Sequence, residues 1–151
     1  MSGLDSDDLA RLRVALARIG RGLDRHSRGE ELTRTQVSVL GTVAVRGPIG
    51  MGELAAIEGL NPTMLSRLAG KLAAAGLLMR DTDPDDGRAI RVAATEQGLA
   101  EHHRQRAERT RLLAAHVDGL PGGHAEGLRA ALPALEALAS SLRDEPAGTG
   151  R

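Results

Sequence analysis

Apolar residues recur at helical spacing near both ends of the chain. Over residues 4–25 they lie three and four positions apart, which predicts a helix whose narrow apolar seam packs against another helix. The residues of this seam are Leu9, Leu12, Leu16, Ile19 and Leu23. Residues 124–143 predict a second such helix, with one face formed by Leu128, Ala131, Leu132, Leu135, Leu138 and Leu142. Packing within one chain and packing between two chains both fit the first seam.

Proline and glycine divide the rest of the chain. Thr33 and Gln36 have the spacing of a capping box, which predicts a helix that begins there and ends at Gly47-Pro48. Its predicted inner face consists of Val37, Leu40, Val43 and Ala44. Inside the C-terminal helix, Pro133 predicts a kink or a helix that begins near it, because the ring removes a backbone donor. The glycine-rich residues 47–52 are interpreted as a linker and a helix start.

Two short helices follow with a tight junction between them. Residues 51–58 form the first, which begins after Gly50 and ends at Gly59. Asn61 is a good N-cap and Pro62 suits the first helical position, so a second helix runs from there towards Gly76. Its predicted inner face is Leu65, Leu68, Ala69 and Leu72. This arrangement is typical of a helix-turn-helix.

A hairpin follows the second short helix. Residues 77–80 and 89–94 are strand-like, and the second run alternates apolar and polar positions. The Asp-Pro-Asp-Asp-Gly between them is turn chemistry. Thr95 then caps a long polar helix that ends near residue 117. The fold class predicted is therefore mainly α with one small hairpin.

Composition restricts the function classes. The chain has no Cys, Phe, Tyr or Trp, which excludes disulfides, thiolate metal sites and aromatic platforms for single-stranded nucleic acid. Basic and acidic residues balance at 20 each, so any nucleic-acid contact depends on local clustering. We see no signal peptide and no apolar run of about 20 residues, so we expect a cytoplasmic protein without a membrane partner.

Metal binding and catalysis are poorly supported. Asp81, Asp83 and Asp85 resemble the opening of a calcium loop, but Asp86 and Val92 stand where that loop needs its glycine and closing glutamate. No histidine pair has the spacing of a helical zinc site, and no nucleophile, acid and base are grouped. We therefore expect no metal, no cofactor and no enzymatic activity.

The outward face of the second short helix offers chemistry for duplex DNA. It carries Thr63, Ser66, Arg67 and Lys71 and no acid. Such a face fits a major groove about 12 Å wide, although many solvated surface helices carry two cations. The hairpin turn would project Arg88, whose side chain suits a minor groove about 6 Å wide. Asp86 would pair with Arg88 and orient it.

The segments LSRLAGKLAAAGLLMR and DPDDGRAIRVAATEQG resemble the recognition helix and wing of the MarR family of winged-helix transcription regulators. Asp86, Arg88, Thr95 and Gly98 stand at the wing-signature positions. The resemblance implies a homodimer on a palindromic DNA site, usually a repressor, which a small-molecule effector often releases. It also implies dimer contacts through the terminal helices, here at Leu9, Leu12, Leu16, Ile19, Leu128, Leu132, Leu135 and Leu138.

The expected organisation has four parts. Residues 1–32 form an N-terminal dimerisation helix, 33–98 the winged helix-turn-helix, 99–143 the C-terminal dimerisation helices and 144–151 a disordered tail. The function expected is regulation of transcription through sequence-specific binding to double-stranded DNA. A winged-helix adaptor that binds protein and not DNA is the alternative, favoured slightly by the zero net charge and the acids in the turn.

Overall fold

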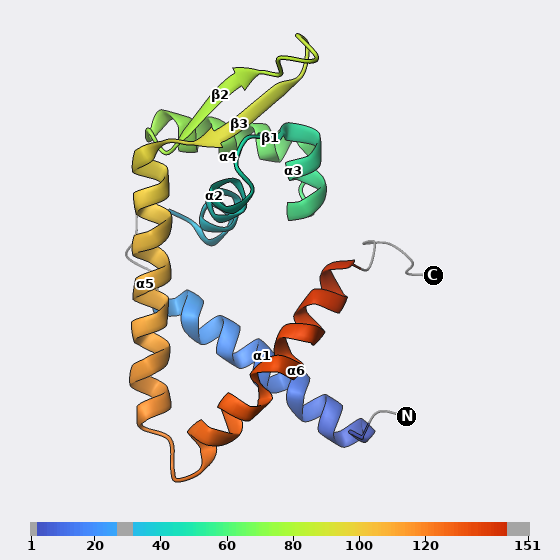
Figure 1. Ribbon diagram of the computed structural model, residues 1–151, viewed down its shortest axis with the longest axis vertical. Coiled ribbons are helices and arrows are strands. Elements are labelled where there is room, and N and C mark those ends of the chain that lie inside the picture. The colour runs from blue at the N-terminus through green and yellow to red at the C-terminus, as the bar shows by residue number, and fades with distance from the viewer. Residues whose placement is uncertain (1–2, 27–31, 145–151) are drawn as a thin grey trace. The chain divides into compact units, whose positions relative to one another are not determined.

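A computed structural model of the chain describes residues 3–26 and 32–144 (Figure 1). Its helices are α1 (Ser6–His26), α2 (Arg34–Arg46), α3 (Met51–Glu58), α4 (Pro62–Ala74), α5 (Glu96–Asp118) and α6 (His124–Asp144). Its strands are β1 (Ile49–Gly50), β2 (Leu78–Thr82) and β3 (Ile90–Ala94). This mostly helical fold with one small sheet confirms the predicted fold class. The disordered tail predicted for residues 144–151 lies, from residue 145 on, outside the described residues.

The chain divides into two compact units. The first is Met1–Arg109 and the second is Thr110–Arg151, so α5 contributes to both. The first unit contains α2, α3, α4 and the sheet, and the second contains α6. In the described part of the chain, no helix has an apolar stretch of the length that a membrane crossing needs.

Local sequence signals set the helix ends as predicted. The hydroxyl of Thr33 accepts the Gln36 N–H at 3.3 Å, and the Gln36 amide oxygen accepts the Thr33 N–H at 2.8 Å, so the capping box forms. Gly59 ends α3 with a φ of 64°, a left-handed conformation that a glycine adopts without a steric penalty. Asn61 caps α4 by accepting the Met64 N–H at 2.8 Å. These contacts confirm the predicted helix-turn-helix.

The sheet has three strands in the order β1-β3-β2, all antiparallel. Leu78 pairs with Ala94 and Thr82 with Ile90, so β2 and β3 form the predicted hairpin. The interpretation of residues 47–52 as a linker and helix start was incomplete, since Ile49 pairs with Val92. A strand of two residues is too short to show an alternating pattern in the sequence. β1 is a strand only because it pairs with β3.

One apolar core connects α2, α3, α4 and the sheet. Its members are Val39, Leu40, Val43, Ile49, Leu54, Ala55, Leu65, Ala69, Leu72, Leu77, Leu78 and Val92. The predicted inner face of α2 was partly wrong, because Val39 is fully buried whereas Val37 and Ala44 are half-buried. The reason is that α2 contacts α3, α4 and β3 together, which widens its inward face. Leu68, predicted inside, is also half-buried.

Helix α6 runs from His124 to Asp144 with Pro133 inside it. A helix that begins near Pro133 is therefore not observed, and the predicted kink at that residue stays a prediction.

Candidate nucleic-acid interface

Helix α4 presents the residues predicted to read DNA on its exposed side. Thr63, Ser66, Arg67 and Lys71 are all exposed, whereas the opposite side is buried in the core. A shallow depression at the start of the helix is lined by Pro62, Thr63, Ser66 and Arg67. The helix contains no acidic residue, so its exposed side carries positive charge only. The structure therefore brings the four predicted residues onto one accessible cationic surface.

A carboxylate holds α3 against α2 and so supports the helix-turn-helix from behind. Both oxygens of Glu58 accept hydroxyl hydrogen bonds, from Ser38 at 2.8 Å and from Thr42 at 2.5 Å. Glu58 is the last residue of α3, directly before the turn into α4. Sequence reasoning missed this contact because the two donors lie 20 and 16 residues away.

Acidic side chains shape the hairpin turn between β2 and β3. The Asp83 carboxylate accepts the Asp85 N–H at 2.9 Å, and the Asp86 carboxylate accepts the Arg88 N–H at 3.1 Å. The turn is closed by backbone hydrogen bonds from Asp83 N–H to the Ala89 carbonyl and from Ala89 N–H to the Asp86 carbonyl. These carboxylates therefore act as acceptors for backbone N–H groups, which is the usual role of aspartate in turns.

Arg88 lies in this turn and is exposed. Asp86 reaches the backbone of Arg88 and not its side chain, and the ion pairs found among the described residues do not include the two together. The predicted orientation of the hairpin by Asp86 thus takes a different form, in which the carboxylate fixes the main chain at Arg88. Among the described residues, no hydrogen bond or ion pair engages the Arg88 guanidinium.

Two arginines of the sheet were missed by sequence reasoning. Arg80 of β2 donates from Nη2 to the Ser66 carbonyl of α4 at 2.6 Å. Arg91 of β3 donates in the same way to the Pro48 carbonyl at 2.7 Å. Each bond joins segments far apart in sequence, and neither has a local signal.

A hydrogen-bonded junction joins the end of α4 to the start of α5. Thr95 donates from its hydroxyl to the Gly76 carbonyl at 2.5 Å and accepts the Gly98 N–H at 3.0 Å. The Thr95 N–H donates to the Leu77 carbonyl at 3.0 Å. Thr95 therefore caps α5, as predicted, and also fixes the chain where it leaves the helix-turn-helix.

A second group of polar residues lies away from the α4 surface. Asp24 at the end of α1 forms ion pairs with Arg34 of α2 at 3.2 Å and with Arg109 of α5 at 3.9 Å. One turn before Arg109, Gln105 is buried and its amide donates to Glu101 at 2.8 Å. Hydrogen bonds from Arg104 and Gln105 lower the pKa of Glu101, with Arg104 contributing most. Gln105 Oε1 and Arg109 Nε are buried without a hydrogen-bond partner among the described residues.

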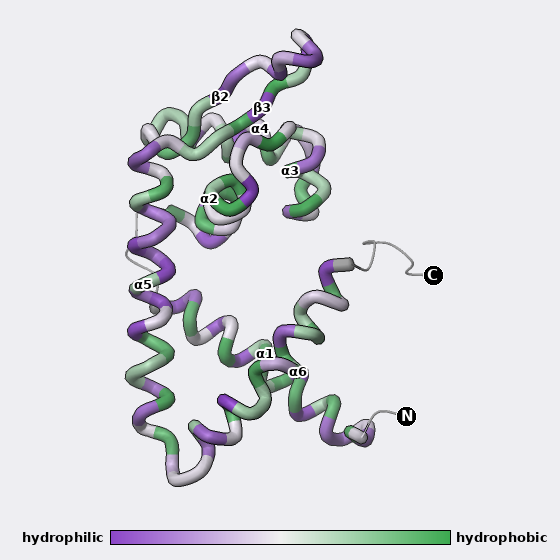
Figure 2. The backbone as a smooth tube through the Cα atoms, in the orientation of Figure 1, coloured by the Kyte–Doolittle hydropathy of each residue, from purple (hydrophilic) through white to green (hydrophobic). Residues whose placement is uncertain are grey.

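The residues predicted to lie in a dimer interface are mostly exposed apolar side chains. Those exposed by more than a third are Leu9, Leu16, Ile19, Leu128, Leu132 and Leu138. Leu12 and Leu135 are half-buried. Hydrophobic and hydrophilic residues alternate along both α1 and α6 (Figure 2).

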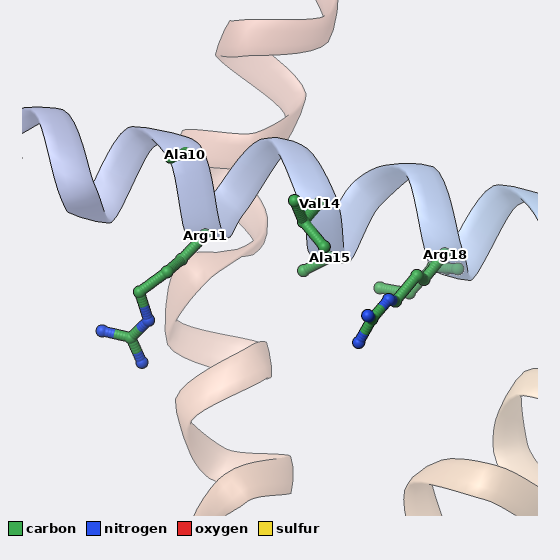
Figure 3. A pocket seen from close by; sticks show the side chains of 6 residues that line it. Ala10, Arg11, Val14, Ala15 and Arg18 are labelled. Carbon is green, nitrogen blue, oxygen red and sulfur yellow. The ribbon is translucent and has the colours of Figure 1, made fainter.

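Helix α1 carries a further apolar surface that the sequence analysis did not identify. Figure 3 shows Val14 and Ala15 between Arg11 and Arg18 on one side of the helix. With Ala10 and Ile19, these residues line a shallow and largely apolar depression. Val14 was missed because it lies outside the three-and-four spacing of the leucine seam.

Comparison with known proteins identifies the family. Residues 32–90 match the model of the MarR family. An HTH-type transcriptional regulator of Mycobacterium bovis is 31% identical over 137 residues, which covers 89% of this chain and 96% of the relative. The chain belongs to the MarR family. It is thus a winged-helix transcription regulator, in which the β2–β3 hairpin is the wing and α4 is the second helix of the helix-turn-helix, the helix that stands where the family has its recognition helix.

Solved structures of MarR-family proteins share this fold. The Multiple Antibiotic Resistance Repressor, MarR, is 20% identical with a TM-score of 0.74, over 87% of this chain and 95% of that one. A Staphylococcus aureus MepR mutant bound to an oligodeoxyribonucleotide is 19% identical with a TM-score of 0.64, over 88% and 96%. NadR in complex with 4-hydroxyphenylacetate is 18% identical with a TM-score of 0.69, over 95% and 96%. At such identities the likeness concerns the fold.

Proposed function

We propose that this MarR-family protein is a repressor that binds a palindromic operator as a homodimer, by sequence-specific contact with double-stranded DNA. The observation that carries the proposal is the surface of α4, where Thr63, Ser66, Arg67 and Lys71 are exposed together without an acid. The MepR structure with an oligodeoxyribonucleotide supports DNA as the partner. The alternative of a protein-binding adaptor lacks an equivalent observation.

Each part of the winged helix has a separate task in this mechanism. Helix α4 enters the major groove, where Ser66 and Arg67 contact base edges and Thr63 and Lys71 contact phosphates. The wing inserts Arg88 into the adjacent minor groove, where the negative potential attracts a guanidinium. The Asp86 carboxylate stiffens the turn by accepting the Arg88 N–H, so less freedom is lost on binding.

The twofold symmetry of the proposed homodimer requires a palindromic operator. Two copies related by a twofold axis present two recognition helices to half-sites about one helical turn apart. A repressor of this kind acts by occupying the operator. The name of the structurally similar repressor MarR supports this sign of regulation.

We expect Arg88→Ala to weaken binding to the cognate duplex about tenfold or more without unfolding the protein, because a good groove contact is worth about 1–3 kcal/mol. Arg88 is exposed, and its backbone N–H, which Asp86 holds, is kept by alanine. The measurement is fluorescence anisotropy with a duplex that the wild-type protein selects from a randomised library.

Arg129→Ala is the matched control, because Arg129 is an exposed arginine of α6, outside the winged helix. It should bind the selected duplex as the wild type does. Equal affinity of the wild type and Arg88→Ala would remove the wing from the mechanism. Failure of the wild type to select any duplex, even at low salt, would refute DNA binding itself and favour the adaptor.

A second proposal is that a small molecule controls DNA binding. The supporting observation is a pair of buried polar atoms, Gln105 Oε1 and Arg109 Nε, which lie one turn apart on α5 and have no hydrogen-bond partner in the described part of the chain. An acceptor and a donor in that arrangement could satisfy a polar ligand. An effector that binds the DNA-free state more tightly than the DNA-bound state would release the protein from DNA. The test is titration of small carboxylates and phenols, beginning with 4-hydroxyphenylacetate, against the complex of protein and selected duplex.

A further inference from the structure

Arg80 extends from the wing onto the recognition helix. It lies in β2, which packs against α4 (Figure 1). Its Nη2 donates to the Ser66 carbonyl at 2.6 Å and lies 3.8 Å from the position that a Cβ on Gly70 would occupy. The guanidinium therefore rests on α4 beside Ser66 and Gly70.

This position belongs to the DNA-reading side of α4. Ser66 and Gly70 are one turn apart, and Thr63, Arg67 and Lys71 share their side of the helix because of the 3.6-residue period. Arg80 is itself exposed. Among the described residues, no ion pair connects it with a carboxylate. The side that carries Arg67 and Lys71 thus receives a third positive charge from outside the helix.

We propose that Arg80 is a DNA-backbone contact that the recognition helix holds in place for a phosphate. This inference rests on the proposed DNA binding and adds a residue to it. A guanidinium has five N–H donors in a planar fork, so the one bond to Ser66 leaves donors for two phosphate oxygens. Since the bond to Ser66 already restricts the side chain, the contact with phosphate orders little that was mobile before.

A phosphate contact has a specific signature in the salt dependence of binding. Each phosphate that a protein neutralises adds about −0.9 to the slope of log affinity against log salt concentration. A residue that only supports the fold changes affinity without changing this slope. A residue that reads a base weakens binding to the selected sequence and spares binding to unrelated DNA.

The experiment compares the full-length wild type, Arg80→Met and Arg80→Lys on two duplexes of equal length, the one selected by the wild type and one of unrelated sequence. Arg91→Met is the matched control, because Arg91 makes the same kind of bond from the neighbouring strand but to the Pro48 carbonyl and not to a residue of α4. Affinities are measured by anisotropy over a range of salt concentrations. Urea unfolding of each variant reports its stability.

We expect Arg80→Met to reduce the magnitude of the salt slope by about one on both duplexes and to weaken both complexes roughly tenfold near 0.1 M salt. Arg80→Lys should keep the slope, because an ammonium still neutralises a phosphate, and Arg91→Met should keep it as well.

An unchanged slope for Arg80→Met would overturn the proposal and leave a positioning role. A loss confined to the selected duplex would also overturn it, in favour of a base contact. Absence of any binding by the wild type would instead refute the proposed function.

Discussion

Gly98 shows how closely two segments approach at the base of the wing. A Cβ at this position would overlap the Leu77 carbonyl oxygen and lie 2.9 Å from the Leu77 carbonyl carbon, so the backbone would have to shift. The same carbonyl accepts the Thr95 N–H, and Thr95 accepts the Gly98 N–H. The first turn of α5 therefore packs directly on the chain that enters β2. Any side chain at Gly98 must separate the two.

We expect Gly98→Ala to destabilise the protein by about 1–3 kcal/mol, the usual cost of overpacking, because the atom in the way belongs to the backbone and cannot rotate aside. The measurement is urea unfolding followed by circular dichroism. Gly52→Ala is the control, since its Cβ would meet no atom within 4 Å among the described residues and alanine favours the helix α3 by about 0.5–1 kcal/mol. Equal stability of Gly98→Ala and the wild type would show that the close approach does not exist in solution.

At the scale of the elements, features that depend on neighbouring residues were predictable from the sequence, and features that depend on distant residues were not. The caps at Thr33 and Asn61 and the end of α3 at Gly59 depend on neighbours within four residues, so the sequence alone indicated them. The strand β1 depends on pairing with β3 some 40 residues later, and no pattern in two residues indicates that.

The contacts of the candidate site also divide into those that nearby residues determine and those that distant residues determine. Thr63, Ser66, Arg67 and Lys71 follow from the helical period once the inner face of α4 is known. The contact of Arg80 with the Ser66 carbonyl spans 14 residues and exists only after the sheet has packed on α4. The role of Asp86 was predicted in part, because an aspartate two residues before an arginine suits a turn. The sequence does not show whether its carboxylate contacts the backbone or the side chain of Arg88, and in the structure it contacts the backbone N–H.

Helices α2 and α5 meet at a histidine whose charge opposes folding. A Cβ at Gly41 of α2 would lie 3.5 Å from the ring of His102 of α5. Burial lowers the pKa of His102, and Arg106 and His103 lower it further. The unfolded chain therefore binds a proton at a higher pH than the folded protein. Stability from this group is present above the ordinary value of 6.5 and is lost as the pH falls through the lowered folded value.

We expect the free energy of unfolding to decrease as the pH is lowered from above 6.5 to below it. The decrease should be smaller in His102→Gln. The lowered pKa of Glu101 gives stability that is lost only in the acid range of carboxylates, and comparison with the wild type removes its contribution. Urea unfolding at each pH provides the measurement. His103→Gln, at the exposed neighbour, keeps the burial of His102 and should retain most of the dependence. An identical dependence in wild type and His102→Gln would contradict this assignment.

At the scale of the whole molecule, the exposed apolar side chains of α1 and α6 are candidates for the interface of the proposed homodimer. Leu16 is 43% exposed and Leu132 is 51% exposed, although both belong to regular apolar stripes. Scattered surface leucines are ordinary, but ordered stripes on helices mark contact surfaces. A second copy of this chain is the partner that the proposed palindromic operator requires.

Leu132→Glu should therefore convert a dimer, with twice the mass of 15.8 kDa, into a monomer, because a carboxylate buried in an apolar interface costs several kcal/mol. Sedimentation equilibrium measures the mass directly.

Val45→Glu is the matched control, since Val45 is 74% exposed on α2, outside both stripes, and the charge there should leave the dimer intact. The monomer should also lose most of its affinity for the full palindrome while it keeps weak binding to a single half-site. A wild-type mass of one chain would refute the proposed homodimer. A dimer that survives Leu132→Glu unchanged would place the self-association surface elsewhere.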